Sequence, residues 1–169
     1  MKLSSQEEYG LRCLLHIARQ GKGGSLTIPQ ISQAEGITEF YTAKLLRLLR
    51  RGGLVSSVRG QAGGYKLTRP PEQIVIGEVL ALLGGHLFDP AFCDSHAGVG
   101  TVCTHTVDCS IRSLWHAVQI VVDHVLYRTT LKELISNEQE MSTWVNPLIQ
   151  LASAEMKSLK GSSETTRRY

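Results

Sequence analysis

Residues 27–69 hold two short helical patterns followed at once by an alternating strand pattern, and few folds accommodate that order. The first helix is expected to begin at Thr27, a good capping residue, with Pro29 in its first turn, and to end at Gly36. The second follows Thr38 with the sequence EFYTAKLLRLLRR and ends at a pair of glycines. Two short helices joined by a glycine-containing turn are typical of a helix-turn-helix.

Two strand-like segments come next along the chain. LVSSVR (54–59) and YKLTR (65–69) alternate in polarity around the glycine-rich sequence GQAGG, a pattern that predicts a β-hairpin. A helix-turn-helix followed directly by a hairpin is a winged helix. Helical patterns flank it on both sides, over about residues 5–20 and in IVIGEVLALLGG. We therefore expect a mainly α fold with a small β-hairpin wing.

The longest amphipathic pattern begins at residue 111 and continues to about residue 126. Its apolar residues fall on one helical stripe, which consists of Ile111, Leu114, Trp115, Val118, Val122, Val125 and Leu126. A winged domain of this size cannot cover that stripe alone, so we expect the helix to pack against a second chain.

These patterns divide the chain into four segments. We expect a winged helix-turn-helix domain over residues 1–85, a loop with three cysteines over 86–110, a dimerisation helix over 111–135, and a C-terminal helix with a disordered tail over 136–169. A length of 169 residues allows one globular core with an appendage, but not two full domains.

Composition limits where the protein is expected to work. There is no run of eighteen apolar residues, so no membrane-spanning helix is expected, and the opening sequence MKLSSQEEYG is not of the secretory type. We expect a cytoplasmic protein whose four cysteines are reduced thiols or metal ligands rather than disulfides.

The two halves of the chain differ in charge. Residues 1–80 contain 11 Lys and Arg against 6 Asp and Glu, a net charge of +5, whereas residues 81–169 contain 7 against 9, a net charge of −2. Between Phe40 and Pro71 there are seven basic residues and no acidic one. A stretch of one sign on a helix and hairpin indicates a polyanionic partner.

The second helix of the helix-turn-helix is expected to enter the major groove of DNA. Arg47, Arg50 and Arg51 lie late in this helix and suit phosphate contacts, while Arg59, next to Gly60 at the wing tip, suits a minor groove. A solvated basic helix on a protein-binding module is the weaker alternative, because the basic residues are confined to the helix and the wing. The exposed candidates for base contacts are Thr38, Glu39, Phe40, Thr42 and Lys44.

Three of the four cysteines lie within seventeen residues, with nine residues between Cys93 and Cys103 and five between Cys103 and Cys109. Thiolates are soft ligands, so this cluster suits an iron–sulfur cluster or zinc. The alternative is three unligated thiols at a redox-active or vestigial site. Cys13, within the first helix, is expected to be a small packing residue.

The sequence SSVRGQAGGYKLTRP resembles the wing signature of the Rrf2 superfamily of bacterial regulators, and MKLSSQEEYGLRCLLHIA resembles its opening helix. The resemblance covers roughly residues 1–135 and ends near Leu-Lys-Glu-Leu at 131–134. It implies a homodimer, with the long helix as its interface, that binds palindromic double-stranded DNA. By the same resemblance Arg59 is the wing arginine, Ala43 stands where some cluster-binding members have a glutamate that restricts operator choice, and the contact positions of the recognition helix are Thr38, Phe40, Tyr41 and Lys44.

The IscR- and NsrR-like members of this superfamily hold an iron–sulfur cluster with three cysteines of the same loop. The resemblance therefore implies a 2Fe–2S or 4Fe–4S cluster on Cys93, Cys103 and Cys109, which aerobic purification can remove. Arg112 stands where IscR-like members have a histidine ligand, and a guanidinium offers no lone pair. The first gap between cysteines is also longer than in those members.

The fourth ligand must then come from elsewhere. We assign it to Glu8 of the opposite subunit, as in NsrR-like members, although a capping box between Glu8 and Ser5 is an equally matched role for this residue. The competing ligands near the cysteines are His96, His105 and His116.

Together these features predict a transcriptional regulator, most simply a repressor, whose DNA affinity depends on a cluster that senses redox state, nitric oxide or iron status. The alternative is a cluster-free Rrf2 repressor controlled by a small effector, a protein partner or direct thiol oxidation. An electron-transfer or cluster-carrier protein would need neither the basic helix nor the wing. An enzyme is not expected, because no nucleophile–base constellation is visible and GQAGG lacks the lysine and hydroxyl of a P-loop.

Overall fold

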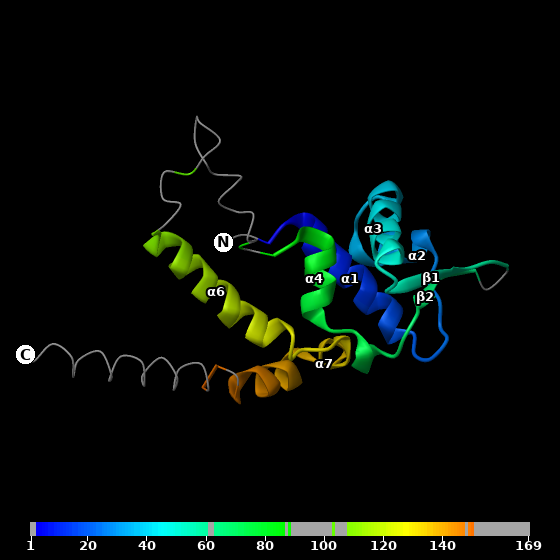
Figure 1. Ribbon diagram of the computed structural model, residues 1–169. Coiled ribbons are helices and arrows are strands. Elements are labelled where there is room, and N and C mark those ends of the chain that lie inside the picture. Colours follow the sequence, from blue (N-terminus) through cyan, green and yellow to red (C-terminus); the bar gives the residue numbers. More distant parts are fainter. Residues whose placement is uncertain are drawn as a thin grey trace, which may run out of the picture. The chain divides into compact units, whose positions relative to one another are not determined.

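The computed structural model describes residues 3–60, 63–86, 88, 103, 108–147, 149 and 150. Cys93, His96, His105 and the tail from residue 151 onward, which carry expectations above, lie outside these residues. The chain groups into two compact units, Met1–Ile135 and Ser136–Tyr169. The elements of the first unit (Figure 1) are α1 (Ser5–Arg19), α2 (Ile28–Glu35), α3 (Glu39–Arg51), β1 (Val55–Val58), β2 (Gly64–Leu67), η1 (Pro71–Gln73), α4 (Ile76–Gly84), α6 (Ser110–Leu126) and α7 (Leu131–Ile135).

A capping box fixes the start of α1. The Ser4 hydroxyl accepts a hydrogen bond from the Glu7 amide at 3.2 Å, and the Glu7 carboxylate accepts one from the Ser4 amide at 2.8 Å. The box suggested for Ser5 and Glu8 is therefore wrong by one residue. Glu8 is left with its carboxylate available to other groups on α1.

Local signals of the same kind delimit α2 and α3. Thr27 and Gln30 form a second capping box, and Gly36 ends α2 in the left-handed conformation with φ +65°, which glycine adopts without strain. Thr38 caps α3 by accepting a hydrogen bond from the Tyr41 amide at 3.2 Å. The predicted helix-turn-helix is confirmed in all of these features.

The wing is a two-stranded antiparallel hairpin in which Val55 pairs with Leu67 and Val58 with Gly64. A further bridge between Leu26 and Tyr65 attaches it to the connection between α1 and α2, and the hairpin then projects away from the helices (Figure 1). A side chain at Gly64 would lie 2.5 Å from the Leu26 carbonyl oxygen, so only glycine permits this close approach. The predicted hairpin is thus confirmed.

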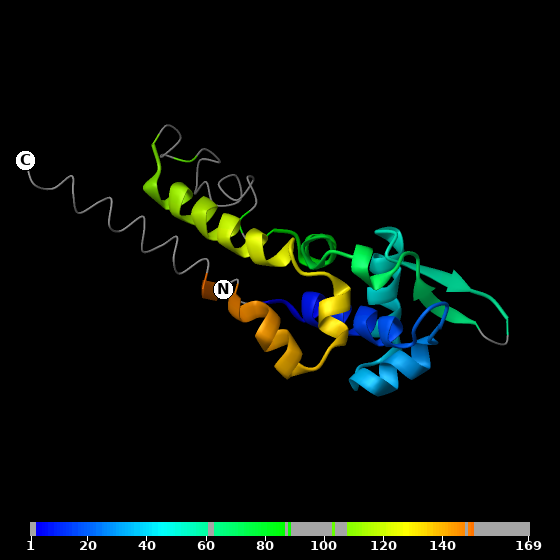
Figure 2. The ribbon, with the colours of Figure 1, turned by 90° about the horizontal axis from the view of Figure 1, so that it is seen from below.

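The hydrophobic core lies where α1, α2, α3 and α4 meet. Figure 1 shows α1 between α3 and α4, and Figure 2 shows the wing extending away from these helices. Leu131 of α7 is also fully buried in the core. The other large, fully buried side chains of the core include Leu14, Ile17, Ile31, Leu45, Leu46, Leu49, Ile74 and Leu83. None of the helices in the residues given above is long and apolar enough to span a membrane.

The end of α6 is tied to the core by main-chain hydrogen bonds. The Ile76 amide donates to the Thr129 carbonyl at 2.9 Å, and the Leu131 amide donates to the Ile74 carbonyl at 2.8 Å. The Tyr127 ring lies directly over Gly77, where any larger side chain would collide with it. The last turn of α6 is therefore anchored to the winged domain.

The apolar stripe predicted on α6 is divided between two faces. Trp115 stacks on Phe88 with 4.8 Å between ring centroids, and Leu126 packs against the core of its own chain. By contrast Ile111, Leu114 and Val121 are 54–59% exposed. Two residues of the predicted stripe, Trp115 and Leu126, thus make contacts within their own chain, and the exposed apolar residues include Val121, which the predicted stripe omitted.

The second unit is described from Ser136 to Gln150, with position 148 excepted. Residues 138–147 are helical, and the Asn137 side chain caps them by accepting a hydrogen bond from the Glu140 amide at 2.9 Å.

Candidate DNA-binding surface and cysteine site

The outward face of α3 carries one aromatic side chain and three cations. Phe40, Lys44, Arg47 and Arg51 follow one another at spacings of four, three and four residues, which places them on a single side of the helix. All four are exposed, and Phe40 is 83% exposed. We call these four residues the α3 outer face. Arg50 is exposed as well, but it lies on the flank of this face.

Thr42 was expected among the exposed base-contacting residues, and this is wrong. Its side chain is fully buried, and its hydroxyl donates to the Thr38 carbonyl at 3.0 Å. The reason is helix geometry, because Thr42 shares the inward side of α3 with Leu45, Leu46 and Leu49. Thr38, Glu39, Phe40 and Lys44 are exposed as predicted.

Tyr41 is held at the edge of this surface by contacts with α1. It is half-buried, and its ring meets the Tyr9 ring edge-on at 6.3 Å between centroids. The Lys44 ammonium lies 6.0 Å from the Tyr41 ring, and the Arg12 guanidinium lies 5.5 Å from the Tyr9 ring. These contacts restrict the Tyr41 ring while leaving part of it accessible.

The wing presents further basic groups. Arg59 and Gly60 are exposed at the end of β1, and Gly60 has φ +101° and accepts a hydrogen bond from the Gly63 amide at 2.8 Å. Lys66 is exposed on β2. In the part of the basic stretch that the structure describes, Arg69 alone forms an ion pair, with Glu78 at 2.6 Å. The other cations of helix and wing are therefore available to an anionic partner.

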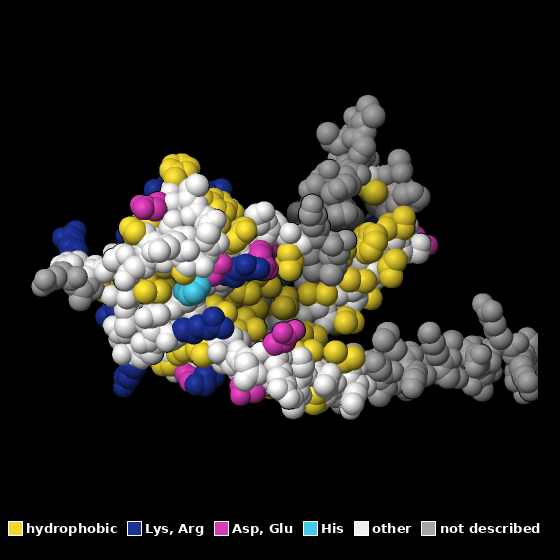
Figure 3. Space-filling model, turned by 180° about the vertical axis from the view of Figure 1, so that it is seen from behind, with side chains coloured by type: hydrophobic (Ala, Val, Ile, Leu, Met, Phe, Trp, Pro, Cys, Tyr) yellow, Lys and Arg dark blue, Asp and Glu magenta, His cyan; other side chains and the backbone are white. Residues whose placement is uncertain are grey.

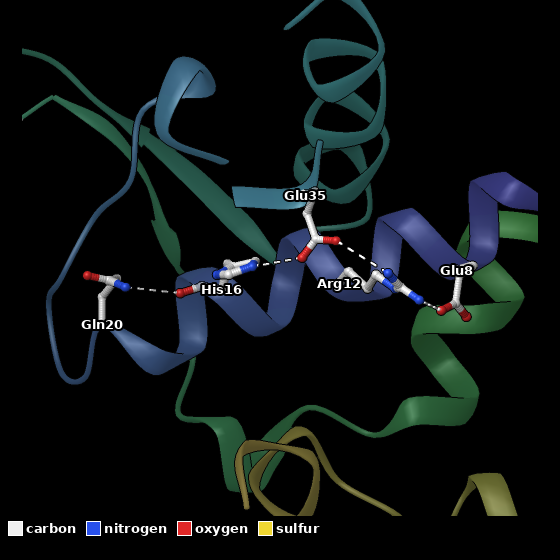
Figure 4. Close-up of polar contacts among 5 residues, drawn as sticks. All are labelled: Glu8, Arg12, His16, Gln20 and Glu35. Carbon is white, nitrogen blue, oxygen red and sulfur yellow. Dashed lines mark hydrogen bonds and ion pairs between the residues drawn. The ribbon is translucent and has the colours of Figure 1, made fainter. Parts of the chain in front are cut away.

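Four charged or titratable side chains connect α1 to α2 (Figure 4). Arg12 lies 2.6 Å from Glu8 and 3.7 Å from Glu35, while His16 Nε2 lies 2.7 Å from Glu35. The hydrogen bond and negative charge of Glu8 raise the pKa of Arg12. The Glu35 side chain is only 9% exposed, so its two partners offset the loss of solvation. The regular spacing of Glu8, Arg12 and His16 was visible in the sequence, but Glu35, the partner shared by Arg12 and His16, was not.

The cysteines occupy different environments. Cys13 is fully buried in the core, and burial, followed by the negative charge of Glu35, raises the pKa of its thiol to about 12. Its predicted packing role is confirmed. Cys103 and Cys109 are half-exposed.

Cys109 caps the N-terminus of α6. Its sulfur accepts a hydrogen bond from the Arg112 amide at 3.4 Å, where the exposed amides and the helix dipole favour negative charge. No group of three or more metal-binding side chains is assembled among the residues placed by the structure. Cys93, His96 and His105 fall outside that part, and His116 is exposed on α6.

Comparisons with known proteins agree with the winged-helix architecture. The sequence profile of Rrf2, an iron-dependent transcriptional regulator, matches residues 3–137. The HTH-type transcriptional regulator IscR of Photobacterium profundum is 33% identical over 144 residues, which make up 84% of this chain and 81% of that protein. The residues that the family profile matches, 3–137, include the helix-turn-helix, the wing and α6.

Solved structures give the same relationship. T. potens IscR superimposes with a TM-score of 0.63 and 29% identity, over 80% of this chain and 86% of its own. CymR, the global cysteine regulator of B. subtilis, superimposes with a TM-score of 0.65 and 28% identity, over 80% of this chain and 96% of its own. With its helix-turn-helix, its wing and a profile match over most of its length, this chain belongs to the Rrf2 family of transcriptional regulators.

Proposed function

We propose that the protein is a homodimeric repressor that reads a palindromic operator with α3 in the major groove and the wing in the adjacent minor groove. The observation that carries this proposal is the α3 outer face, a row of exposed side chains directly opposite the buried side of the helix. A major groove accommodates one helix, and side chains near the N-terminus of that helix meet the base edges.

The proposed role of each residue on this surface depends on its distance from the N-terminus of α3. Thr38, Phe40, Tyr41 and Lys44 lie in the first turns of α3 and are assigned to base contacts. Arg47, Arg50 and Arg51 lie farther from the N-terminus and are assigned to phosphates, which contribute affinity rather than sequence readout. Arg59, with Gly60 permitting a close backbone approach, is assigned to the minor groove.

The proposed dimer interface is the exposed stripe of α6. Ile111, Leu114, Val118, Val121 and Val125 recur at alternating spacings of three and four residues, the pattern of a helix that packs along a second helix. Apolar side chains also gather along α6 in Figure 3, at the right of that view. A two-fold axis through this stripe would present two recognition helices to the two half-sites of a palindrome.

Leu114→Glu is expected to weaken dimerisation by at least about 100-fold, because each of the two subunits would place a carboxylate against apolar side chains. Sedimentation equilibrium at micromolar concentration would measure this change. Ile120→Glu is the matched control: Ile120 is 56% exposed and Leu114 is 55% exposed, but Ile120 lies off the stripe. A dimer that tolerates Leu114→Glu and not Ile120→Glu would place the interface on another side of α6.

We further propose that the loop cysteines Cys93, Cys103 and Cys109 hold an iron–sulfur cluster whose state controls DNA affinity. The position of Cys109 at the α6 N-terminus and the half-exposed Cys103 fit this donor set. A bound cluster would supply iron that reacts with oxidants or diatomic gases. Because Cys109 caps α6, a change in its ligation would alter the start of the helix that carries the proposed dimer interface.

Glu8 of the opposite subunit remains the proposed fourth ligand. Glu8→Ala is expected to alter the visible spectrum of the anaerobically reconstituted protein and to shorten the cluster lifetime under air or nitric oxide, since one donor is lost. Its ion pair with Arg12 provides the control: Arg12→Ala breaks the same pair without removing a donor and should retain the wild-type spectrum. If Glu8→Ala retains that spectrum and His105→Ala or His116→Ala does not, the ligand is the histidine.

Direct control through thiols is the second candidate. Cys103 and Cys109 are half-exposed, which allows oxidation without prior unfolding, whereas the buried Cys13 is protected. The relationship to CymR, which is named the global cysteine regulator of its organism, supports this candidate. A dependence of operator affinity on oxidant in iron-free protein would favour it.

A further inference from the structure

Phe40 is exposed to an extent that the fold does not account for. Its side chain is 83% exposed, whereas Ile111, the next most exposed large apolar side chain among the residues that the structure describes, is 59% exposed and belongs to the proposed dimer interface. A phenylalanine is ordinarily among the most buried residue types, because removing its ring from water is favourable. An aromatic ring left in water at a functional surface is therefore expected to be covered by a partner.

The neighbours of Phe40 indicate which partner covers it. It is the second residue of α3 and shares the outer face with Lys44 and Arg47, so it lies at the end of the helix that is proposed to meet base edges. Tyr41, the next residue, is drawn back against Tyr9. Phe40 therefore extends into solvent from a basic surface, whereas the ring of Tyr41 beside it already packs against Tyr9.

The chemistry of the ring restricts what it can recognise. Phenylalanine has no hydrogen-bond donor or acceptor, so it cannot distinguish the polar groups of the base edges. The one apolar group that a major groove displays is the C5 methyl of thymine. We propose that Phe40 is a specificity-determining residue that reads a thymine methyl in each operator half-site. This inference rests on the proposed operator binding and adds the base that one residue recognises.

The test removes only the methyl group. Operators selected from random duplex DNA with the wild-type protein would be resynthesised with deoxyuridine in place of thymidine, one symmetric pair of positions at a time. Burial of about one methyl group, ~0.8 kcal/mol, corresponds to a change of about fourfold in affinity for each half-site and about 15-fold for the symmetric pair. One pair of positions should show this loss with wild-type protein, measured by fluorescence anisotropy.

Phe40→Ala should bind more weakly and should lose the difference between thymidine and deoxyuridine at that pair. Lys44→Ala is the matched control, because it should also bind more weakly while keeping the full difference. 5-Methylcytosine compared with cytosine at the same pair should restore part of the methyl-dependent affinity for wild type only. Thermal unfolding would verify that both variants are folded.

Three results would overturn the inference: no methyl-sensitive position, a methyl effect that persists in Phe40→Ala, or operator affinity unchanged by Phe40→Ala. The last would assign the exposed ring to a protein partner instead. Failure of the proposed function gives a different result, since the wild-type protein would then select no sequence from the random pool.

Discussion

Reversing the charges of Lys44 and Arg47 together is expected to lower operator affinity by at least about 100-fold at physiological salt. Both residues belong to the α3 outer face, and neither forms an ion pair among the residues that the structure places. Contacts of this kind contribute about 1–3 kcal/mol each, and the new carboxylates would also repel the phosphates. Neither side chain is in the core, so the free energy of unfolding should change little.

The matched control carries the same change in net charge elsewhere on the protein. Arg19 and Lys22 are exposed at the end of α1 and in the following turn, and neither belongs to the α3 outer face. Arg19→Glu with Lys22→Glu should lower affinity far less, through long-range electrostatics alone. In a plot of log binding constant against log salt concentration, the slope for the α3 variant should also be less steep by about 0.9 for each phosphate contact removed. Equal losses in the two double variants would contradict the assignment of α3 as the DNA-reading helix.

Replacing any one of Cys93, Cys103 or Cys109 by Ala is expected to prevent stable cluster incorporation, the second large effect. The loop contains three cysteines, and all three are proposed ligands. Loss of one leaves too few soft donors to hold iron and sulfide. Cys13→Ala should incorporate the cluster as wild type does, because Cys13 is buried in the core with a thiol pKa of about 12. The core thiol and the loop thiols are thus expected to behave oppositely.

Anaerobic reconstitution with ferrous iron and sulfide measures this directly, with iron, sulfide and visible absorbance determined per chain. Colourless protein from aerobic purification would not decide the question, since exposed clusters are lost to oxygen. If the wild-type chain incorporates no iron or sulfide under anaerobic conditions, the cluster proposal is wrong. Operator affinity would then be compared before and after oxidation of the thiols to examine direct thiol control.

Local sequence signals determined most of the secondary structure. Thr27 with Gln30 starts α2, Gly36 ends it, and the glycine-rich turn between alternating segments forms the wing, all as predicted. Each of these signals acts within a few residues, through a side chain that bonds a nearby amide or a backbone angle that only glycine adopts readily. The helical period alone also placed Lys44 and Arg47 on an exposed face.

The tertiary structure decided which side of each element is covered. Thr42 is polar and lies in the recognition helix, so it was expected to be exposed. It is buried because it shares the side of α3 that packs against α1 with Leu45 and Leu49. On α6, the periodic apolar residues formed one broad stripe in the sequence, and only the packing of Trp115 and Leu126 within the chain separated an inner face from an outer one. Apolar periodicity reports that a surface will be covered, but not which neighbour covers it.

The same distinction applies to the polar network of α1. The sequence placed Glu8, Arg12 and His16 one helical turn apart, but it could not show that Glu35 of α2 joins them. The start of a helix or a turn depends on contacts between residues close together in the chain, so the sequence predicts it. A buried carboxylate shared by two helices depends on how the helices pack, because only that packing brings residues distant in sequence within reach of one another.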